Sequence, residues 1–166
     1  MPDYKPEQCW ASHLPSLFSC LLATNGPVLE VGAGDWSTPL LRQYCKTAER
    51  KFVSIEEDPV WAAKYGSFCH SGDELTAVLK AAAEQSKKIP FGWSVVFMDH
   101  NGHRRAKDAL LFADAAEYIV VHDYPSPDIF KDFPTDRWKH QIVDRRARPW
   151  TLVLTQHDHL KERMWQ

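Results

Sequence analysis

Paired cysteines, long apolar runs and an excess of positive charge are all missing from this sequence. The cysteines show neither a CxxC pair nor the spacing of a zinc finger or a disulfide scaffold. We therefore expect reduced, buried thiols at all four positions: Cys9, Cys20, Cys45 and Cys69. No segment approaches the roughly 18 to 20 apolar residues of a spanning helix, and the first residues lack the order of a signal peptide. The sequence predicts a cytoplasmic protein with no membrane partner.

The charge balance gives no sign of a polyanionic partner. The formal net charge is -2 at pH 7, whereas proteins that bind nucleic acids usually carry a strongly basic balance or patch. A short basic cluster near the C-terminus is the local exception, and we expect it to be a solvated loop or strand edge: Arg145, Arg146 and Arg148. The sequence therefore gives no reason to expect a nucleic-acid partner.

The length and composition are those of one ordinary globular domain. The chain has 166 residues, of which 44% are hydrophobic and 25% charged, and a chain of this size can bury one sizeable core. It contains no internal repeat, no low-complexity segment and no proline-rich linker. Residues 1–166 are therefore predicted to form a single domain.

Short apolar runs alternate with segments of helical spacing along the chain. Strands are expected at 27–32, 51–55, 93–98, 118–121 and 150–155, with a weak strand at 68–70 and a neighbour of the last strand at 138–143. Helices are expected at 15–22, after Ser37, from Pro59, at 73–85 and at 103–116. This order predicts an α/β fold with a mostly parallel sheet, helices on both faces and an antiparallel strand near the C-terminus.

The segment Val28 to Thr38 carries the most informative pattern. A buried strand leads into a turn that contains Gly32 and Gly34, and a helix with a capping hydroxyl opens at Ser37. Glycines let the backbone turn tightly and come within contact distance of a ligand. Trp36 lies inside the turn, where its ring could cover a cofactor. The pattern predicts a cofactor site, and a glycine-rich turn without a ligand remains the alternative.

Charged side chains follow the strands of the predicted sheet. In an open parallel sheet, ligands bind outside the carboxyl ends of the strands where the strand order reverses, so these side chains should converge on one crevice. The carboxylates after the second of these strands can accept both hydroxyls of a ribose. The side chains at the strand ends are Glu30, Glu56, Glu57, Asp99, His122 and Asp123.

Three histidines lie close to the predicted strand ends: His100, His103 and His122. A neutral imidazole there could take a proton from a substrate hydroxyl. A hydrogen-bonded structural histidine is the alternative at each position, and nothing in their spacing requires a zinc site.

Four segments together resemble a known family. Residues 30–38 and 53–61 resemble the first two motifs of class I S-adenosylmethionine-dependent methyltransferases, and residues 95–100 and 120–124 are similar to later strands of small-molecule and sugar O-methyltransferases. The resemblance covers roughly residues 27–125. It implies a Rossmann-like fold, S-adenosylmethionine as cofactor, and methyl transfer to an oxygen, or less commonly a nitrogen, of a small-molecule or sugar acceptor.

Carried over residue by residue, the resemblance implies a cofactor site and a metal site. Gly32 and Gly34 would face the methionine part of the cofactor, Glu30 would lie near its amino group, and Glu56 would hold the ribose. Asp73 would lie near the adenine. The expected cofactor-binding set is Glu30, Gly32, Gly34, Trp36, Ser37, Glu56 and Asp73. In metal-dependent enzymes of this type, acids at the positions of Asp99 and Asp123 ligate Mg²⁺, a hard cation that requires oxygen ligands.

The sequence departs from this family at two points. The turn carries Trp36 where a glycine is usual, and Gly102 stands where catechol-type enzymes have a lysine three residues after the metal-binding aspartate. A base must then come from His103 or His100, and Asp99 could act as a general base without a metal. The expected catalytic residues are Asp99, His103 and Asp123.

Two other functions remain open at this point. A dinucleotide-dependent oxidoreductase also uses a glycine turn, but its G-x-G-x-x-G fingerprint would require glycine where this chain has Ser37. A non-catalytic nucleotide-binding or scaffold protein of the same fold is the other alternative, because a fold alone does not specify an activity.

Overall fold

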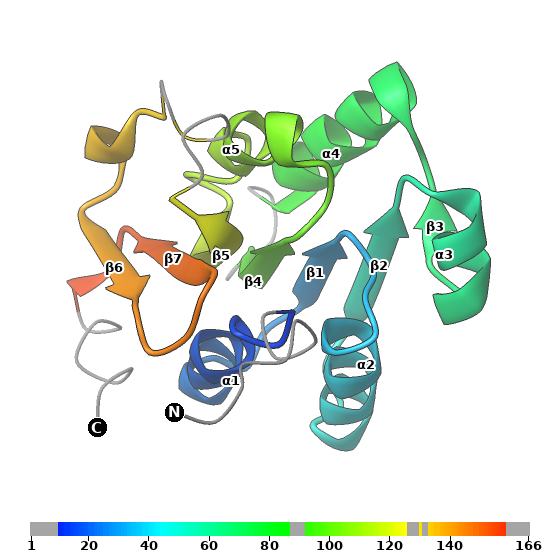
Figure 1. Cartoon of the computed structure of the whole chain (residues 1–166), viewed down its shortest axis with the longest axis horizontal. Helices are drawn as coiled ribbons and strands as arrows, with labels where there is room; N and C mark the ends of the chain where they lie inside the picture. The colour runs from blue at the N-terminus through cyan, green and yellow to red at the C-terminus, as the bar shows by residue number, and fades with distance from the viewer. Residues whose placement is uncertain (1–9, 87–91, 126–129, 131–132, 159–166) are drawn as a thin grey trace.

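The structure is a computed structural model that describes residues 10–86, 92–125, 130 and 133–158 (Figure 1). The described helices are α1 (Leu14–Ala23), α2 (Ser37–Thr47), α3 (Pro59–Tyr65), α4 (Gly72–Ser86) and α5 (Gly102–Leu110), with a short 3-10 helix η2 (Thr135–Arg137). The described strands are β1 (Val28–Val31), β2 (Phe52–Glu56), β3 (Phe68–Cys69), β4 (Trp93–Met98), β5 (Ala116–Tyr124), β6 (His140–Asp144) and β7 (Trp150–Thr155).

These strands form a seven-stranded sheet in the order β3-β2-β1-β4-β5-β7-β6. The first five strands of this order are mutually parallel, whereas β7 runs antiparallel to both β5 and β6. The predicted α/β fold, with its mostly parallel sheet and its antiparallel strand near the C-terminus, is confirmed. The chain passes from β1 outward to β3 and then returns to β4 on the other side of β1, so the strand order reverses between β1 and β4.

Two helical layers cover the sheet, with α1 and α2 on one face and α4 and α5 on the other (Figure 1). Successive side chains of a strand point to opposite faces, and β4 shows the result: Val95 and Phe97 pack in one core with α1 and α2, whereas Val96 and Met98 pack in the other with α4 and α5. Both faces of the central strands are therefore apolar, which explains their nearly continuous hydrophobic sequence.

The helix expected at 103–116 is shorter than predicted. α5 ends at Leu110, and the N–H groups of Leu111, Phe112 and Ala113 each bond a carbonyl three residues earlier. The Ala115 carbonyl accepts the Trp93 N–H at 3.0 Å. Pairing with β4 thus takes over from the helix, and β5 begins at Ala116.

The strand expected at 118–121 is longer than predicted, because β5 continues to Tyr124. Its pairing with β7 shifts register between Val121 and Tyr124, and Asp123 has a positive φ of 62° within this irregular stretch. Bulges of this kind redirect side chains at the end of a strand. His122 and Asp123 therefore lie inside β5 and not after it.

The cysteine expectation holds in part. Cys20 and Cys45 are buried and form no disulfide with a described residue, Cys69 is exposed on the two-residue edge strand β3, and Cys9 lies outside the described residues. None of the described helices is long and apolar enough to cross a membrane.

Candidate functional site

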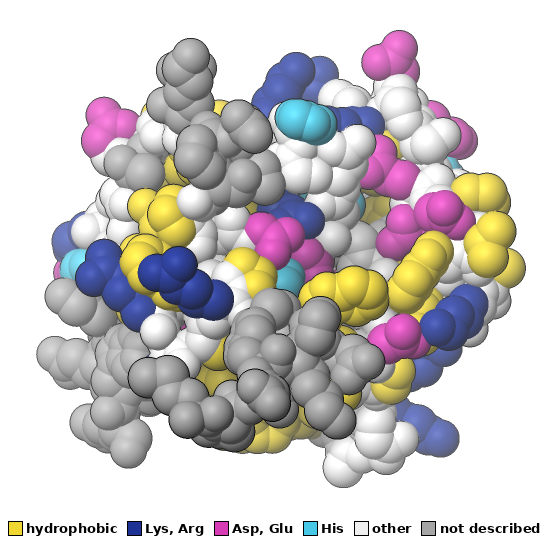
Figure 2. Space-filling view, viewed as in Figure 1, with side chains coloured by type: hydrophobic (Ala, Val, Ile, Leu, Met, Phe, Trp, Pro, Cys, Tyr) yellow, Lys and Arg dark blue, Asp and Glu magenta, His cyan; other side chains and the backbone are white. Residues whose placement is uncertain are grey.

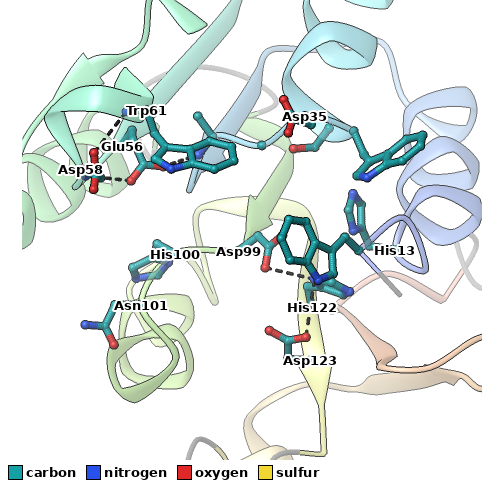
Figure 3. Close-up of a pocket in the computed structure, with 15 residues that line it drawn as sticks. His13, Asp35, Glu56, Asp58, Trp61, Asp99, His100, Asn101, His122 and Asp123 are labelled. Carbon is teal, nitrogen blue, oxygen red and sulfur yellow. Dashed lines mark hydrogen bonds and ion pairs between the residues drawn. The ribbon is translucent and has the colours of Figure 1, made fainter. Parts of the chain in front are cut away.

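A cavity of about 430 Å³ opens at the carboxyl ends of β1, β2, β4 and β5, where the strand order reverses (Figure 3). On the face seen in Figure 2, acidic, histidine and hydrophobic side chains gather near the centre. The residues that line the cavity are Trp10, His13, Ala33, Gly34, Asp35, Trp36, Ser37, Glu56, Asp58, Trp61, Asp99, His100, Asn101, His122 and Asp123.

The turn after β1 forms one wall of this cavity through Gly34, Trp36 and Ser37. Gly32 does not form part of this wall. Its φ is +98°, and a Cβ there would lie 2.4 Å from the Asp99 carbonyl carbon and the His100 nitrogen. Gly32 is therefore required by the close approach of the chain after β4, and it is not among the lining residues. A Cβ on Gly34 would meet only the Ser37 hydroxyl, at 3.6 Å.

The Glu56 carboxylate joins this turn to the start of α3. One of its oxygens accepts the Ala33 N–H at 2.6 Å and the other accepts the Asp58 N–H at 2.8 Å. Asp58 in turn caps α3 by accepting the Val60 and Trp61 N–H groups. Asp58 and Trp61 line the cavity with Glu56, although the sequence did not single them out as site residues.

Glu30 lies in the protein interior beneath the turn, and it does not line the cavity. Its side chain is completely buried, and its two carboxylate oxygens accept the Ser37 and Ser54 hydroxyls, each at 2.6 Å. Burial raises the pKa of Glu30 to about 7, and the serine hydrogen bonds offset part of that rise. Glu30 supports the turn from inside the protein, so the structure does not place it where a cofactor amino group would lie.

Replacement of Glu30 by glutamine is expected to stabilise the protein above pH 7. A carboxyl group whose pKa is raised in the folded state binds more protons folded than unfolded, so wild-type stability falls as pH rises from about 4 to 7. Glu30→Gln should remove this slope and gain about 1 to 3 kcal/mol at pH 8. Urea unfolding at pH 5 and pH 8 measures both effects, and equal pH slopes in the two proteins would contradict the raised pKa.

The opposite side of the cavity contains an Asp99–His122–Ser12 chain. The His122 Nδ1 lies 3.0 Å from Asp99 Oδ1, and its Nε2 lies 2.9 Å from the Ser12 hydroxyl, which donates to the Pro149 carbonyl at 2.6 Å. Burial alone would raise the pKa of Asp99, but the His122 hydrogen bond and the charges of His122 and Arg105 hold it below the usual value. Asp99 is therefore an ionised carboxylate at neutral pH.

Arg105 of α5 holds the two aspartates of the site. Its buried guanidinium lies 3.1 Å from Asp99 Oδ1 and 2.6 Å from Asp123 Oδ2, and it also donates to the carbonyls of His100 and His122. A guanidinium already occupies the position between the aspartates, so this donor set does not fit the expected Mg²⁺ bound by Asp99 and Asp123. Sequence reasoning missed Arg105, because nothing in its local sequence distinguishes it from a solvated helix residue.

His13, at the N-terminal end of α1, also lines the cavity and was missed by sequence reasoning. Its ring is only 2% exposed and lies 4.7 Å, between centroids, from both Phe97 and His122. Neither ring nitrogen has a hydrogen-bond partner among the described residues. Burial, followed by the charge of His122, lowers the pKa of His13 to about 3, so its imidazole is neutral.

Besides Glu30 and Gly32, two further expected site residues do not line the cavity. His103 is exposed in the first turn of α5, where its N–H bonds the Asn101 side chain, and Asp73 is exposed in the first turn of α4. His100 does line the cavity, but its buried Nε2 lies 2.9 Å from Asp108, which makes it a structural histidine. His103 and Asp73 therefore stand apart from the candidate site.

One arginine of the C-terminal cluster, Arg148, lines a second cavity beside the first. Arg146 pairs with Asp144 at 2.6 Å, and the guanidinium groups of Arg145 and Arg148 lie 5.0 and 5.1 Å from the Trp150 ring centroid. The second cavity, of about 520 Å³, is lined by Arg148 and Trp150, and it shares Asp123 with the first. Asp123 therefore stands between the two cavities.

Comparison with known proteins supports the fold. No family model matches the sequence, and a search of curated proteins finds no match. A spermidine synthase in complex with the transition-state analogue AdoDATO is similar in structure, with a TM-score of 0.56, 13% identity and coverage of 93% of this chain and 62% of that chain. Spermidine synthase from Thermotoga maritima gives a TM-score of 0.52, 15% identity and coverage of 93% and 60%.

An S-adenosyl-L-methionine methyl transferase from Silicibacter pomeroyi DSS-3 aligns with a TM-score of 0.45, 17% identity and coverage of 92% of this chain and 99% of that chain. The chain spans about three fifths of the length of the spermidine synthases, 62% and 60% of them. Together with the sheet order, the likeness to these synthases defines a Rossmann-like α/β fold.

Proposed function

We propose that this protein is an S-adenosylmethionine-dependent transferase that moves a methyl group to an oxygen, or less commonly a nitrogen, of a small molecule or sugar. One observation carries the proposal: the glycine turn and the Glu56 carboxylate lie side by side in one wall of the cavity. This wall stands where the strand order of the sheet reverses. Ligands of open α/β sheets bind at this place, and the residues there are those of the resemblance in the sequence.

The residues of this wall fit the proposed cofactor. Gly34 leaves open space beside the backbone of the turn, Glu56 offers carboxylate lone pairs toward ribose hydroxyls, and Trp36 and Trp61 offer aromatic faces. The cofactor, when bound, would supply a methyl group activated by a sulfonium. The protein's part is to hold the acceptor in line with that group and to exclude water, since orientation supplies much of the rate in such displacements.

The opposite wall would receive the acceptor. Arg105 fixes the carboxylates of Asp99 and Asp123, and both line the cavity. Ionised carboxylates can accept a hydrogen bond from an acceptor hydroxyl and so orient its oxygen. Asp123 has the more exposed side chain of the two, 39% against 24%, so we propose Asp123 as the group that first contacts the acceptor.

S-Adenosylhomocysteine, the expected product, should bind and raise the melting temperature, by an amount equivalent to about 3 kcal/mol at a hundredfold excess over Kd. Glu56→Ala should weaken this binding by about 10- to 100-fold, since a hydrogen bond to a charged group contributes about 1.5 to 3 kcal/mol. The measurement is thermal unfolding with increasing ligand.

Glu57→Ala is the matched control. Glu57 is the next residue, bonds Arg104 and the Asn101 N–H, and does not line the cavity, so its loss should leave ligand affinity unchanged. Because Glu56→Ala also removes two backbone hydrogen bonds, Trp61→Ala provides a second variant in which those bonds remain. Undiminished binding in both Glu56→Ala and Trp61→Ala would place the ligand elsewhere.

A further inference from the structure

A histidine–aspartate–histidine cluster lies in the acceptor wall, assembled from three separate elements. His13 directly precedes α1, Asp99 directly follows β4, and His122 lies in the irregular end of β5. One ligand-type atom from each residue lies within 4.8 Å of the other two. Figure 3 shows the three side chains together on one side of the cavity, across from Glu56, Asp58 and Trp61.

The buried imidazole of His13 points to a missing partner. Both of its nitrogens are buried without a hydrogen bond among the described residues, and the ring borders the cavity. An unpaired buried polar group costs about 1 to 3 kcal/mol, so a ligand that bonds this imidazole would remove that cost. A neutral imidazole nitrogen is the most common protein ligand for transition metals.

The hydrogen bonds of His122 set up the second ligand. The Ser12 hydroxyl donates its hydrogen to the Pro149 carbonyl, so it is available to accept Nε2–H of His122. In the metal-free protein the Nδ1 of His122 is hydrogen-bonded to Asp99 Oδ1, 3.0 Å away. A metal ion bound between these two atoms would displace the proton that they share. Two ligand atoms about 2.1 Å from a tetrahedral ion lie about 3.4 Å apart, so the two atoms need to separate by only about 0.4 Å to share one ion.

We propose that His13, Asp99 and His122 bind a divalent transition-metal ion such as Zn²⁺, with the remaining coordination position open to the cavity. Two imidazoles and one carboxylate suit Zn²⁺ and its neighbours, whereas Mg²⁺ prefers oxygen ligands alone. Three protein ligands leave a place for an oxygen of the molecule in the cavity, as in catalytic zinc sites. The open position would therefore take a hydroxyl or carbonyl oxygen.

The surroundings of the cluster support a bound dication. Ser12 holds His122 from behind, and Arg105 holds Asp99, which is how outer hydrogen bonds orient metal ligands. Once a metal ion has displaced the proton shared by His122 and Asp99, the carboxylates of Asp99 and Asp123 face the single positive charge of Arg105. These two carboxylates supply the negative charge with which a dication can pair.

Zn²⁺ titration of the metal-free full chain tests this proposal. The wild-type protein should bind one Zn²⁺ per chain, and His13→Phe should lose at least about 100-fold in affinity, while its ring keeps the packing against Phe97. His13→Phe should also melt at a higher temperature than wild type without metal, because it removes two unpaired buried nitrogens. His103→Ala is the control for weak binding by exposed histidines, since His103 lies outside the cavity.

Equal Zn²⁺ affinity in wild type and His13→Phe would overturn the proposal, as would a wild-type protein that binds no Zn²⁺. The proposal would also be overturned if the wild-type protein bound Mg²⁺ in preference to Zn²⁺, and if this binding were lost in Asp123→Asn but kept in His13→Phe. That result would indicate a site formed by Asp99 and Asp123. The metal test does not depend on the proposed cofactor. A protein that binds Zn²⁺ but not S-adenosylhomocysteine would contradict only the proposed function. A protein that binds S-adenosylhomocysteine but not Zn²⁺ would contradict only this metal site.

Discussion

Gly32→Val is expected to prevent stable folding, at a cost of at least about 3 to 5 kcal/mol. A non-glycine residue with a positive φ costs about 1 to 3 kcal/mol, and a β-branched residue is especially disfavoured there. The new Cβ would also lie 2.4 Å from two backbone atoms of Asp99 and His100. These atoms cannot move away easily, because the Asp99 N–H bonds the Val31 carbonyl at 2.8 Å.

Urea unfolding followed by circular dichroism measures this effect, and Gly34→Ala is the matched control. Gly34 lies two residues further along the same turn and lacks a positive φ, and its Cβ would make only an ordinary contact with Ser37. This control should change stability by less than about 1 kcal/mol. A Gly32→Val protein as stable as Gly34→Ala would contradict the close approach of the two chain segments.

Arg105→Leu is expected to destabilise the protein by about 3 to 5 kcal/mol, since it breaks buried ion pairs by removing one partner. The guanidinium pairs with Asp99 and Asp123 and bonds the carbonyls of His100 and His122, none of which leucine can replace. Arg105 also helps to hold the pKa of Asp99 down. The destabilisation should therefore be largest at neutral pH and decrease as the pH falls below about 4, toward the lowered pKa of Asp99 in the wild-type protein.

Arg104→Leu is the control for Arg105→Leu, and chemical unfolding at pH 7 and pH 3.5 compares the two. Arg104 is the preceding residue on α5, and its partly exposed side chain pairs with Glu57 and Asp108, each at 3.3 Å. A pair of this kind contributes about 1 kcal/mol or less. A similar decrease in the free energy of unfolding in both variants would contradict a central structural role for Arg105.

The sheet was predictable because its signal is local. Runs such as residues 93–98 are apolar on both faces of the strand, and the glycine turn before Ser37 marks the passage from strand to helix. The ends of α5 and β5 were harder to predict, because alanine-rich sequence continues past Leu110 and only the pairing with β4 ends the helix. Tertiary hydrogen bonds therefore overrode local helix propensity there.

The candidate site was predictable only where its residues lie on one continuous segment or directly at a strand end. Gly34, Trp36, Ser37 and Glu56 fall in this group, and all four line the cavity. His13 reaches the site because α1 packs across β4 and β5, which no local pattern records. Glu30 shows the converse. Its position at the end of the first strand suggested a ligand contact, whereas its hydrogen bonds with Ser37 and Ser54 hold it in the interior.

Isothermal titration of the wild-type protein with S-adenosylhomocysteine, and with NAD as the comparison, tests the central claim most directly. The proposed function predicts one equivalent of S-adenosylhomocysteine bound per chain and no measurable heat from NAD under the same conditions. Tight binding of NAD would instead indicate a dinucleotide-dependent oxidoreductase. The absence of heat from S-adenosylhomocysteine would contradict the assignment of the cavity between the glycine turn and Glu56 as its site.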